Sequence, residues 1–145
     1  MKIRILWAGK TKEQYLIDGI DRYLKLLGHM AQVSVIDIKE EKGKPRGPAL
    51  AAEGSRILKQ TRSYTLLNEK GREFTSVEFA GYLGKKVNFD FVVGGPYGVS
   101  EEIREKASDT ISLSRMTFTH EMVRLVFLEQ LYRAMTIMKG MEYHH

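Results

Sequence analysis

Hydrophobic positions along the chain switch repeatedly between a period of two residues and a period near 3.6 residues. A period of two marks a strand, because successive side chains of a strand point to opposite faces, and a period near 3.6 marks one face of a helix. On this criterion the sequence predicts five strands, over residues 2–7, 32–38, 63–67, 89–93 and 110–113.

Five helices are predicted between and after these strands. Thr11, followed three residues later by Gln14, forms a capping-box signature for the first helix, and Thr75 with Glu78 forms another for the third. Ser100 is the expected cap of the fourth helix. The three longer helices are predicted over residues 11–28, 49–60 and 120–139.

Strands that alternate with helices are typical of an α/β fold, in which a parallel sheet carries helices on both faces. The only linker-like stretch is residues 39–48 (KEEKGKPRGP), which are rich in charge, glycine and proline. They fit either a mobile basic loop or an ordinary surface connection. No composition shift divides the chain, so residues 1–145 are predicted to form a single domain.

The last predicted helix is apolar around most of its circumference, and such a helix must be buried nearly all round. One sheet covers only one face of it. We therefore expect the other face to meet a second copy of the chain in a homodimer. The apolar side chains of this helix are Met122, Val123, Leu125, Val126, Phe127, Leu128, Leu131, Tyr132, Ala134, Met135, Ile137 and Met138.

Composition narrows the function classes. The 145 residues are 43% hydrophobic and 28% charged, which suits a globular core rather than a disordered chain. The absence of cysteine removes disulfides, thiolate nucleophiles and Cys-based metal sites, and no other metal-binding spacing occurs. No apolar run is long enough for a membrane span or a signal peptide, so a cytoplasmic protein is expected. The net charge of +5 and a pI near 9.4 favour an anionic partner such as RNA.

In a parallel α/β sheet, ligands bind in the crevice beyond the carboxyl ends of the strands. Three segments are predicted to lie there: the turn after Leu67, the loop 94–98 and the run 113–118. The loop, Gly-Gly-Pro-Tyr-Gly, matches neither the Walker nor the dinucleotide glycine pattern. It fits a backbone that approaches a ligand closely, and it equally fits a tight turn with Pro96 at its second position.

The C-terminal residues Glu142–His145 place two imidazoles and a phenol after the last helix. They could be a frayed end or a tag remnant. Alternatively, they could lie over the crevice, where Tyr143 would stack on an unstacked base and His144 would hydrogen-bond to it. His120, at the start of the last helix, is interpreted as structural.

Three functions remain open from the residues alone. The first is an enzyme that binds a nucleotide-like cofactor and acts on RNA. The second is a non-enzymatic RNA- or ribosome-binding factor that uses its basic charge. The third is a small-molecule enzyme of flavodoxin-like shape. Cofactor binding separates the first from the second, and salt-dependent RNA affinity separates the first from the third.

Three sequence motifs, which follow one another along the chain, narrow these functions further. They are VVGGPYG at 92–98, LSRMTFTH at 113–120 and MVRLVFLEQLYRA at 122–134. With these motifs the sequence resembles the large-subunit ribosomal RNA pseudouridine methyltransferase H family, a branch of the SPOUT methyltransferases. The opening MKI, the AGK at 8–10 and the closing EYHH also match this family.

The resemblance implies a homodimer that transfers a methyl group from S-adenosyl-L-methionine (S-adenosylmethionine) to N3 of a pseudouridine in 23S rRNA. The implied substrate is the assembled ribosome. It further implies a SPOUT-type fold in which the C-terminal part of the chain forms a trefoil knot that holds the cofactor.

The resemblance also assigns site residues. Gly94 would let the backbone approach the cofactor, and apolar side chains would form walls for its adenine. Because few other titratable groups lie in the matching motifs, we hypothesise that His144 accepts the N3 proton, with Tyr143 and Arg124 positioning the nucleobase or its phosphate. The implied cofactor contacts are Leu67, Gly94, Leu113, Ser114, Arg115, Met116, Thr117 and Phe118. The candidate contacts to rRNA phosphates are Arg4, Lys10, Lys12, Arg115, Arg124 and Arg133.

Overall fold

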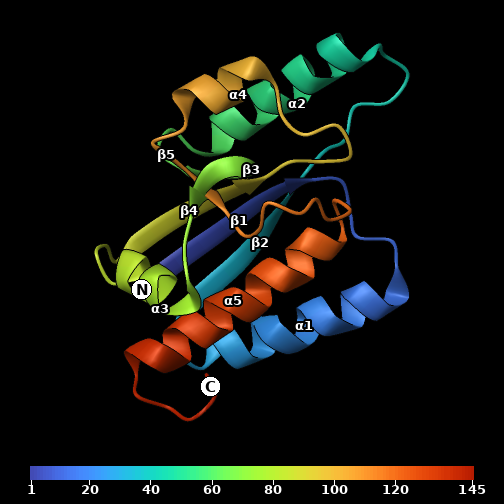
Figure 1. Ribbon diagram of the computed structural model, residues 1–145. Coiled ribbons are helices and arrows are strands. Elements are labelled where there is room, and N and C mark those ends of the chain that lie inside the picture. Colours follow the sequence, from blue (N-terminus) through green and yellow to red (C-terminus); the bar gives the residue numbers. More distant parts are fainter.

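The computed structural model describes all residues, 1–145, and shows one sheet with helices packed against it (Figure 1). The five predicted strands and five predicted helices are all present. The strands are β1 (Lys2–Ala8), β2 (Gln32–Ile38), β3 (Thr65–Glu73), β4 (Asn88–Val93) and β5 (Asp109–Ser112). The helices are α1 (Gln14–Gly28), α2 (Arg46–Gln60), α3 (Ser76–Leu83), α4 (Glu101–Lys106) and α5 (Met122–Met138).

The strands form one sheet in the order β2-β1-β4-β3-β5, and every neighbouring pair is parallel. The predicted parallel sheet is therefore confirmed. Because all strands run the same way, their carboxyl ends lie along one edge. The central position of β3, between β4 and β5, brings the ends of these three strands next to one another.

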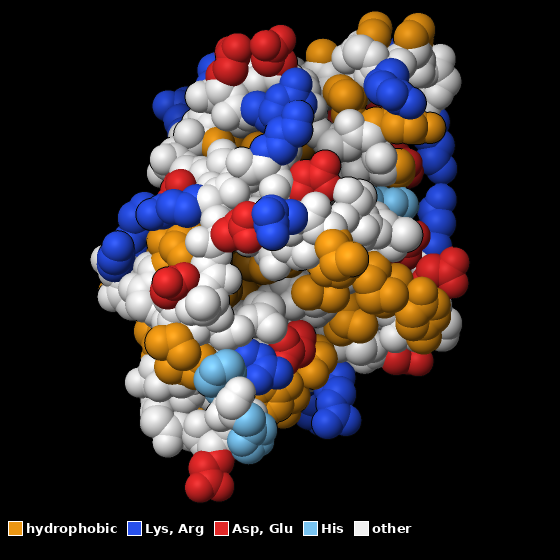
Figure 2. All heavy atoms as spheres, in the orientation of Figure 1, with side chains coloured by type: hydrophobic (Ala, Val, Ile, Leu, Met, Phe, Trp, Pro, Cys, Tyr) orange, Lys and Arg blue, Asp and Glu red, His pale blue; other side chains and the backbone are white.

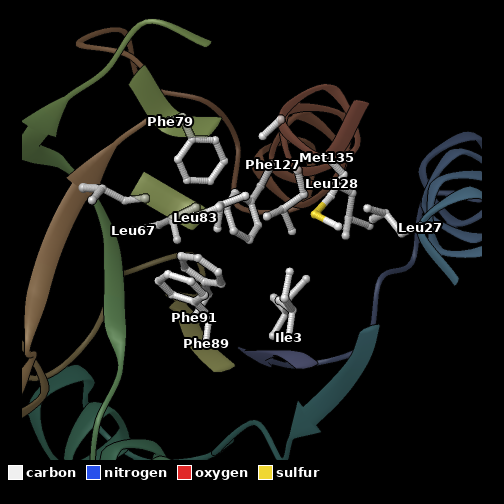
Figure 3. Packing of buried hydrophobic residues seen from close by; sticks show 14 of the residues in the cluster. Ile3, Leu27, Leu67, Phe79, Leu83, Phe89, Phe91, Phe127, Leu128 and Met135 are labelled. Carbon is white, nitrogen blue, oxygen red and sulfur yellow. The ribbon is translucent and has the colours of Figure 1, made fainter. Parts of the chain in front are cut away.

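Helices cover both faces of the sheet, as predicted: α1, α3 and α5 lie on one face and α2 and α4 on the other (Figure 1). The larger core lies under the first group. There Phe127 of α5 packs edge-on against Phe91 of β4, with ring centroids 4.9 Å apart, and Phe91 stacks on Phe89 (Figure 3). A smaller cluster, which includes Leu6 and Ile103, fills the other face.

Two of the three predicted caps are present. The Thr75 side chain accepts the N–H of Glu78 while the Glu78 carboxylate accepts the N–H of Thr75, and Ser100 caps α4. The capping box at Thr11 is wrong, because α1 begins only at Gln14. The hydroxyl of Thr11 is occupied by Arg124, which donates to it from α5.

The N-terminus of α1 is instead held from α5. The carboxylate of Glu121 accepts the backbone N–H groups of Lys12 and Glu13, at 2.7 and 3.2 Å. A residue 108 positions away in sequence thus supplies the acceptor that a local side chain was expected to provide.

Besides the start of α1, two boundaries differ from the sequence prediction by three residues or more. Helix α2 begins at Arg46 rather than at residue 49, with Pro48 in its first turn, where the missing proline N–H costs no hydrogen bond. Strand β3 continues to Glu73, and its pairing with β5 is irregular between Leu67 and Arg72.

The extension of β3 crosses β5 at Gly71. A Cβ added to Gly71 would lie 2.6–2.8 Å from backbone atoms of Ile111, so only glycine fits this crossing. The trefoil knot itself stays a prediction. No helix has the length and apolarity needed to cross a membrane.

We expect Gly71→Ala to lower the free energy of unfolding by about 1–3 kcal/mol or more, because the new methyl group collides with backbone that cannot move aside. Gly81→Ala is the matched control. It lies in α3 with nothing within 4 Å of its added Cβ, so it should stabilise slightly through helix propensity. Chemical denaturation measures both variants, and equal stabilities would contradict the close crossing.

Candidate functional site

A hollow of about 840 Å³ opens at the carboxyl ends of β3, β4 and β5. Its walls are the three segments singled out in the sequence: residues 66–70, which the structure places within β3, residues 93–98 at the end of β4, and residues 113–118 after β5. His120 and Val123, at the start of α5, complete the lining. The volume falls in the range of sites for small ligands and cofactors.

The loop after β4 forms the tight turn that its sequence predicts, and it lines the hollow. The Gly95 carbonyl accepts the N–H of Gly98 at 3.0 Å, which puts Pro96 at the second turn position. Gly98 has a φ of +78°, in the left-handed region. A Cβ added to Gly94 would lie 2.8–3.0 Å from the Gly98 backbone, so the folding of the loop on itself already requires this glycine.

The segment 113–118 forms a strap over the hollow, held by its own hydroxyls. The Ser112 hydroxyl donates to the Ser114 carbonyl at 2.8 Å, and the Ser114 hydroxyl accepts the N–H of Met116 at 2.9 Å. Thr117 donates to the carboxylate of Glu69, 2.5 Å away on the β3 side. The strap is thereby tied to the opposite wall of the hollow.

The structure places seven of the eight implied cofactor residues in this lining: Leu67, Gly94, Leu113, Ser114, Met116, Thr117 and Phe118. Arg115 is the exception. Its side chain is 84% exposed and turns toward Glu73, with Nε 3.6 Å from the carboxylate. It is therefore free to meet an anionic partner at the surface.

Six polar residues in the lining were not among the predicted site residues: Asn68, Glu69, Lys70, Arg104, Thr110 and His120. Asn68 and Glu69 directly follow Leu67, so the predicted strand end was the available signal for them. His120 was interpreted as structural, yet it lines the hollow. Burial and the charge of Arg124 lower its pKa below the usual histidine value, while Glu121 and Glu40 oppose this shift.

Arg124 does not face the solvent. Its side chain is fully buried, with Nη2 2.8 Å from the Ala8 carbonyl, Nη1 2.9 Å from the Thr11 hydroxyl, and the guanidinium 4.8 Å from the Trp7 ring centre. Burial lowers its pKa, against the opposing charge of Glu121. This placement gives Arg124 no direct reach to RNA, and it suits a residue that joins α5 to the turn after β1.

The C-terminal tail lies along the outer side of α5, away from the hollow of its own chain. The Tyr143 hydroxyl is 3.0 Å from the Glu129 carboxylate and 3.3 Å from the Tyr23 hydroxyl. Burial and these two contacts raise the pKa of Tyr143. His144 Nδ1 is 3.2 Å from Arg133, which is 13 residues after His120 and so roughly 20 Å along the helix.

The other basic residues predicted to contact rRNA phosphates lie in different parts of the fold. Arg4 forms an ion pair with Asp90, and Arg133 forms one with Glu129, one helical turn away. Lys10 and Lys12 belong to the segment between β1 and α1. No group of three His, Cys, Asp or Glu side chains in the structure is arranged to hold a metal ion.

Comparison with known proteins identifies the family. A model described as "Predicted SPOUT methyltransferase" matches residues 1–144. The chain belongs to the SPOUT methyltransferase family. The resemblance seen in the sequence motifs is thus confirmed.

Relatives of this SPOUT methyltransferase are similar over their full length. "Ribosomal RNA large subunit methyltransferase H" of Parabacteroides distasonis is 47% identical, with 100% of this chain and 99% of the relative covered. The protein of the same name from Geotalea daltonii is 42% identical, with 100% of both covered.

Two solved structures share the SPOUT fold with this chain. One is a probable methylase family protein from Haemophilus influenzae, with a TM-score of 0.57 and 14% identity over 99% of this chain and 70% of that one. The other is a tRNA (m1G37) methyltransferase from Aquifex aeolicus, with a TM-score of 0.56 and 18% identity over 92% of this chain and 70% of that one.

We expect Arg124→Ala to lower the free energy of unfolding by about 2 kcal/mol or more, because it opens a cavity and leaves the Ala8 carbonyl without its donor. Arg22→Ala, at an exposed position of α1, is the control and should change stability by less than about 0.5 kcal/mol. Thermal and chemical unfolding measure both. Wild-type stability of Arg124→Ala together with lost activity would instead support a direct contact to the substrate.

Proposed function

We propose that this protein transfers a methyl group from S-adenosylmethionine to N3 of a pseudouridine in 23S rRNA, on the assembled ribosome and in the cytoplasm. The observation that carries the proposal is that the motif-bearing segments after β4 and β5 and residues 66–70 of β3 converge on one hollow. Full-length relatives named ribosomal RNA large subunit methyltransferase H support the rRNA substrate.

The lining of the hollow fits the proposed cofactor. Leu67, Leu113, Met116 and Phe118 offer apolar surface for an adenine ring. Glu69 is the only carboxylate in the lining, and it can accept hydrogen bonds from ribose hydroxyls or from an ammonium group. Both a sulfonium and an ammonium are cationic, so a carboxylate in the wall is electrostatically favourable.

Few acids and bases are needed for this chemistry. Bound S-adenosylmethionine supplies a methyl group on a positively charged sulfur, which is already an activated leaving group. The residues of the chain then have to align the nucleobase with that methyl group and exclude water. The strap 113–118, tied to Glu69 through Thr117, is placed to do both.

The proton on N3 of the pseudouridine requires an acceptor. We assign this role to His144, with Tyr143 beside the nucleobase and Arg124 as a positioning residue buried behind the hollow. Because His144 lies on the outer side of α5, it can act only in the hollow of a second protomer. His120 is a second candidate, since it lines the hollow of its own chain and its lowered pKa keeps it neutral near pH 7.

A homodimer accounts for the position of the tail and for the outer surface of α1 and α5. Tyr15, Met116 and Phe118 are exposed on the chain, and Met122 and Val126 on the outer part of α5 are only half-buried. Figure 2 shows apolar side chains gathered over the first halves of α1 and α5. A partner covering this surface would also bring its tail toward the hollow.

Calorimetry with S-adenosylmethionine tests the proposed function. We expect the wild type to bind and Gly94→Val to lose at least about tenfold in affinity, because the added side chain pushes the loop away from Gly98. Gly47→Val, which has nothing within 4 Å of its added Cβ, is the control and should bind normally. If the wild type binds ribosomes but not the cofactor, the chain is a non-enzymatic ribosome-binding factor.

Mixed dimers test the role of the tail. A Gly94→Val chain and a chain that lacks residues 143–145 should each be inactive alone. Reassociated together, they should recover roughly a quarter of wild-type methylation, since half of the dimers are mixed and each mixed dimer holds one intact site. Methyl incorporation into ribosomes measures the recovery. No recovery would rule out action of the tail across the dimer and leave His120 as the proton acceptor.

A further inference from the structure

A second hollow, of about 290 Å³, lies on the other side of the glycine loop. Gly95, Pro96 and Gly98 line both hollows, so the loop is a shared wall between them. The remaining walls of the second hollow come from the segment after β2 and from the first turns of α2, including Glu41, Lys44, Arg46 and Glu53. None of these side chains belongs to the cofactor lining.

One rim of the second hollow is a stacking platform. Tyr97, at the tip of the glycine loop, is 63% exposed, and the guanidinium of Arg46 lies 3.9 Å from the centre of its ring. The guanidinium covers one face of the ring, and an unpaired base of RNA can stack on the face that stays exposed. The platform therefore selects a flat ligand.

The inner wall selects hydrogen-bond donors. Glu53 is 91% buried, its side chain lines the hollow, and one of its oxygens accepts the N–H of Glu41 at 3.0 Å. Its other oxygen has no hydrogen-bond partner and no cation in salt-bridge range. The neighbouring carboxylate of Glu41 differs, because Arg56 and Lys44 neutralise it. Glu53 thus offers a free acceptor at the bottom of the hollow.

We propose that this second hollow binds a nucleotide of the RNA substrate that flanks the methylated one, with a base that carries an exocyclic amino group. The base stacks on Tyr97, its amino group donates to Glu53, and its phosphate is met by Lys44 or Arg46. This inference rests on the proposed function, since the glycine loop would hold the flanking base on one side and the methyl donor on the other. Uracil has no exocyclic amino group and offers Glu53 only its ring N3–H, so we expect it to bind more weakly.

Methylation kinetics with ribosomes as the varied substrate test the proposal. We expect Tyr97→Ala to raise KM for ribosomes by roughly tenfold while kcat and the Kd for S-adenosylmethionine stay within about twofold. Tyr97→Phe, which keeps the ring, should behave like the wild type. Glu53→Gln should also raise KM, because the amide can still accept the N–H of Glu41 but presents donors to the amino group.

Arg62→Ala, an exposed arginine elsewhere on the surface, is the control for a loss of charge and should leave KM unchanged, whereas Arg46→Ala should raise it. An unchanged KM in Tyr97→Ala would overturn the proposal. If the wild type transfers no methyl group to rRNA, the proposed function is wrong. If all the variants methylate rRNA with the KM of the wild type, only the proposal for the second hollow is wrong.

Photocrosslinking tests the contact with RNA directly, because a purely structural role of Tyr97 would not produce a crosslink to a particular base. With a photoreactive phenylalanine derivative in place of Tyr97, we expect a crosslink to an adenine, cytosine or guanine next to the methylated nucleotide. A crosslink to uracil, to distant rRNA or to a ribosomal protein would overturn the assignment.

Discussion

The parallel pairing of β3 between β4 and β5 is the constraint on which the rest of the structure depends. It brings residues 66–70 of β3 next to the carboxyl ends of β4 and β5, so segments that are 15 or more residues apart in sequence become walls of one hollow. The crossing of Gly71 over Ile111, with no room for a side chain, keeps β5 against β3. Without that contact the strap 113–118 would lose its position over the hollow.

Much of this arrangement was predictable from the sequence. Hydrophobic periodicity located all five strands and all five helices, and strand–helix alternation indicated a parallel sheet. The rule that ligands bind beyond the carboxyl ends of parallel strands then selected the three segments that line the hollow. The motifs at 92–98 and 113–120 identified the family, and in the structure these segments form the turn after β4 and the segment after β5 that line the hollow.

The features that sequence reasoning missed depend on contacts between distant residues. Thr11 has the local pattern of a cap, but the buried guanidinium of Arg124 takes its hydroxyl, and Glu121 caps the turn before α1 instead. For the same reason Arg124, taken as a candidate RNA contact, turns out to be buried against Trp7. His120 had no local signal either, because its place in the lining follows from where α5 begins.

The glycine loop 94–98 connects these observations. A Cβ at Gly94 would collide with the Gly98 backbone, so the tight turn of the loop needs this glycine. The folded loop separates the larger hollow from the second hollow, which Tyr97 and Glu53 line. A structure of the protein with bound S-adenosylhomocysteine, the demethylated product of the donor, tests the account most directly. We predict electron density between residues 66–70, 93–98 and 113–118. Well-defined density for this ligand at any other place in the molecule would contradict the account.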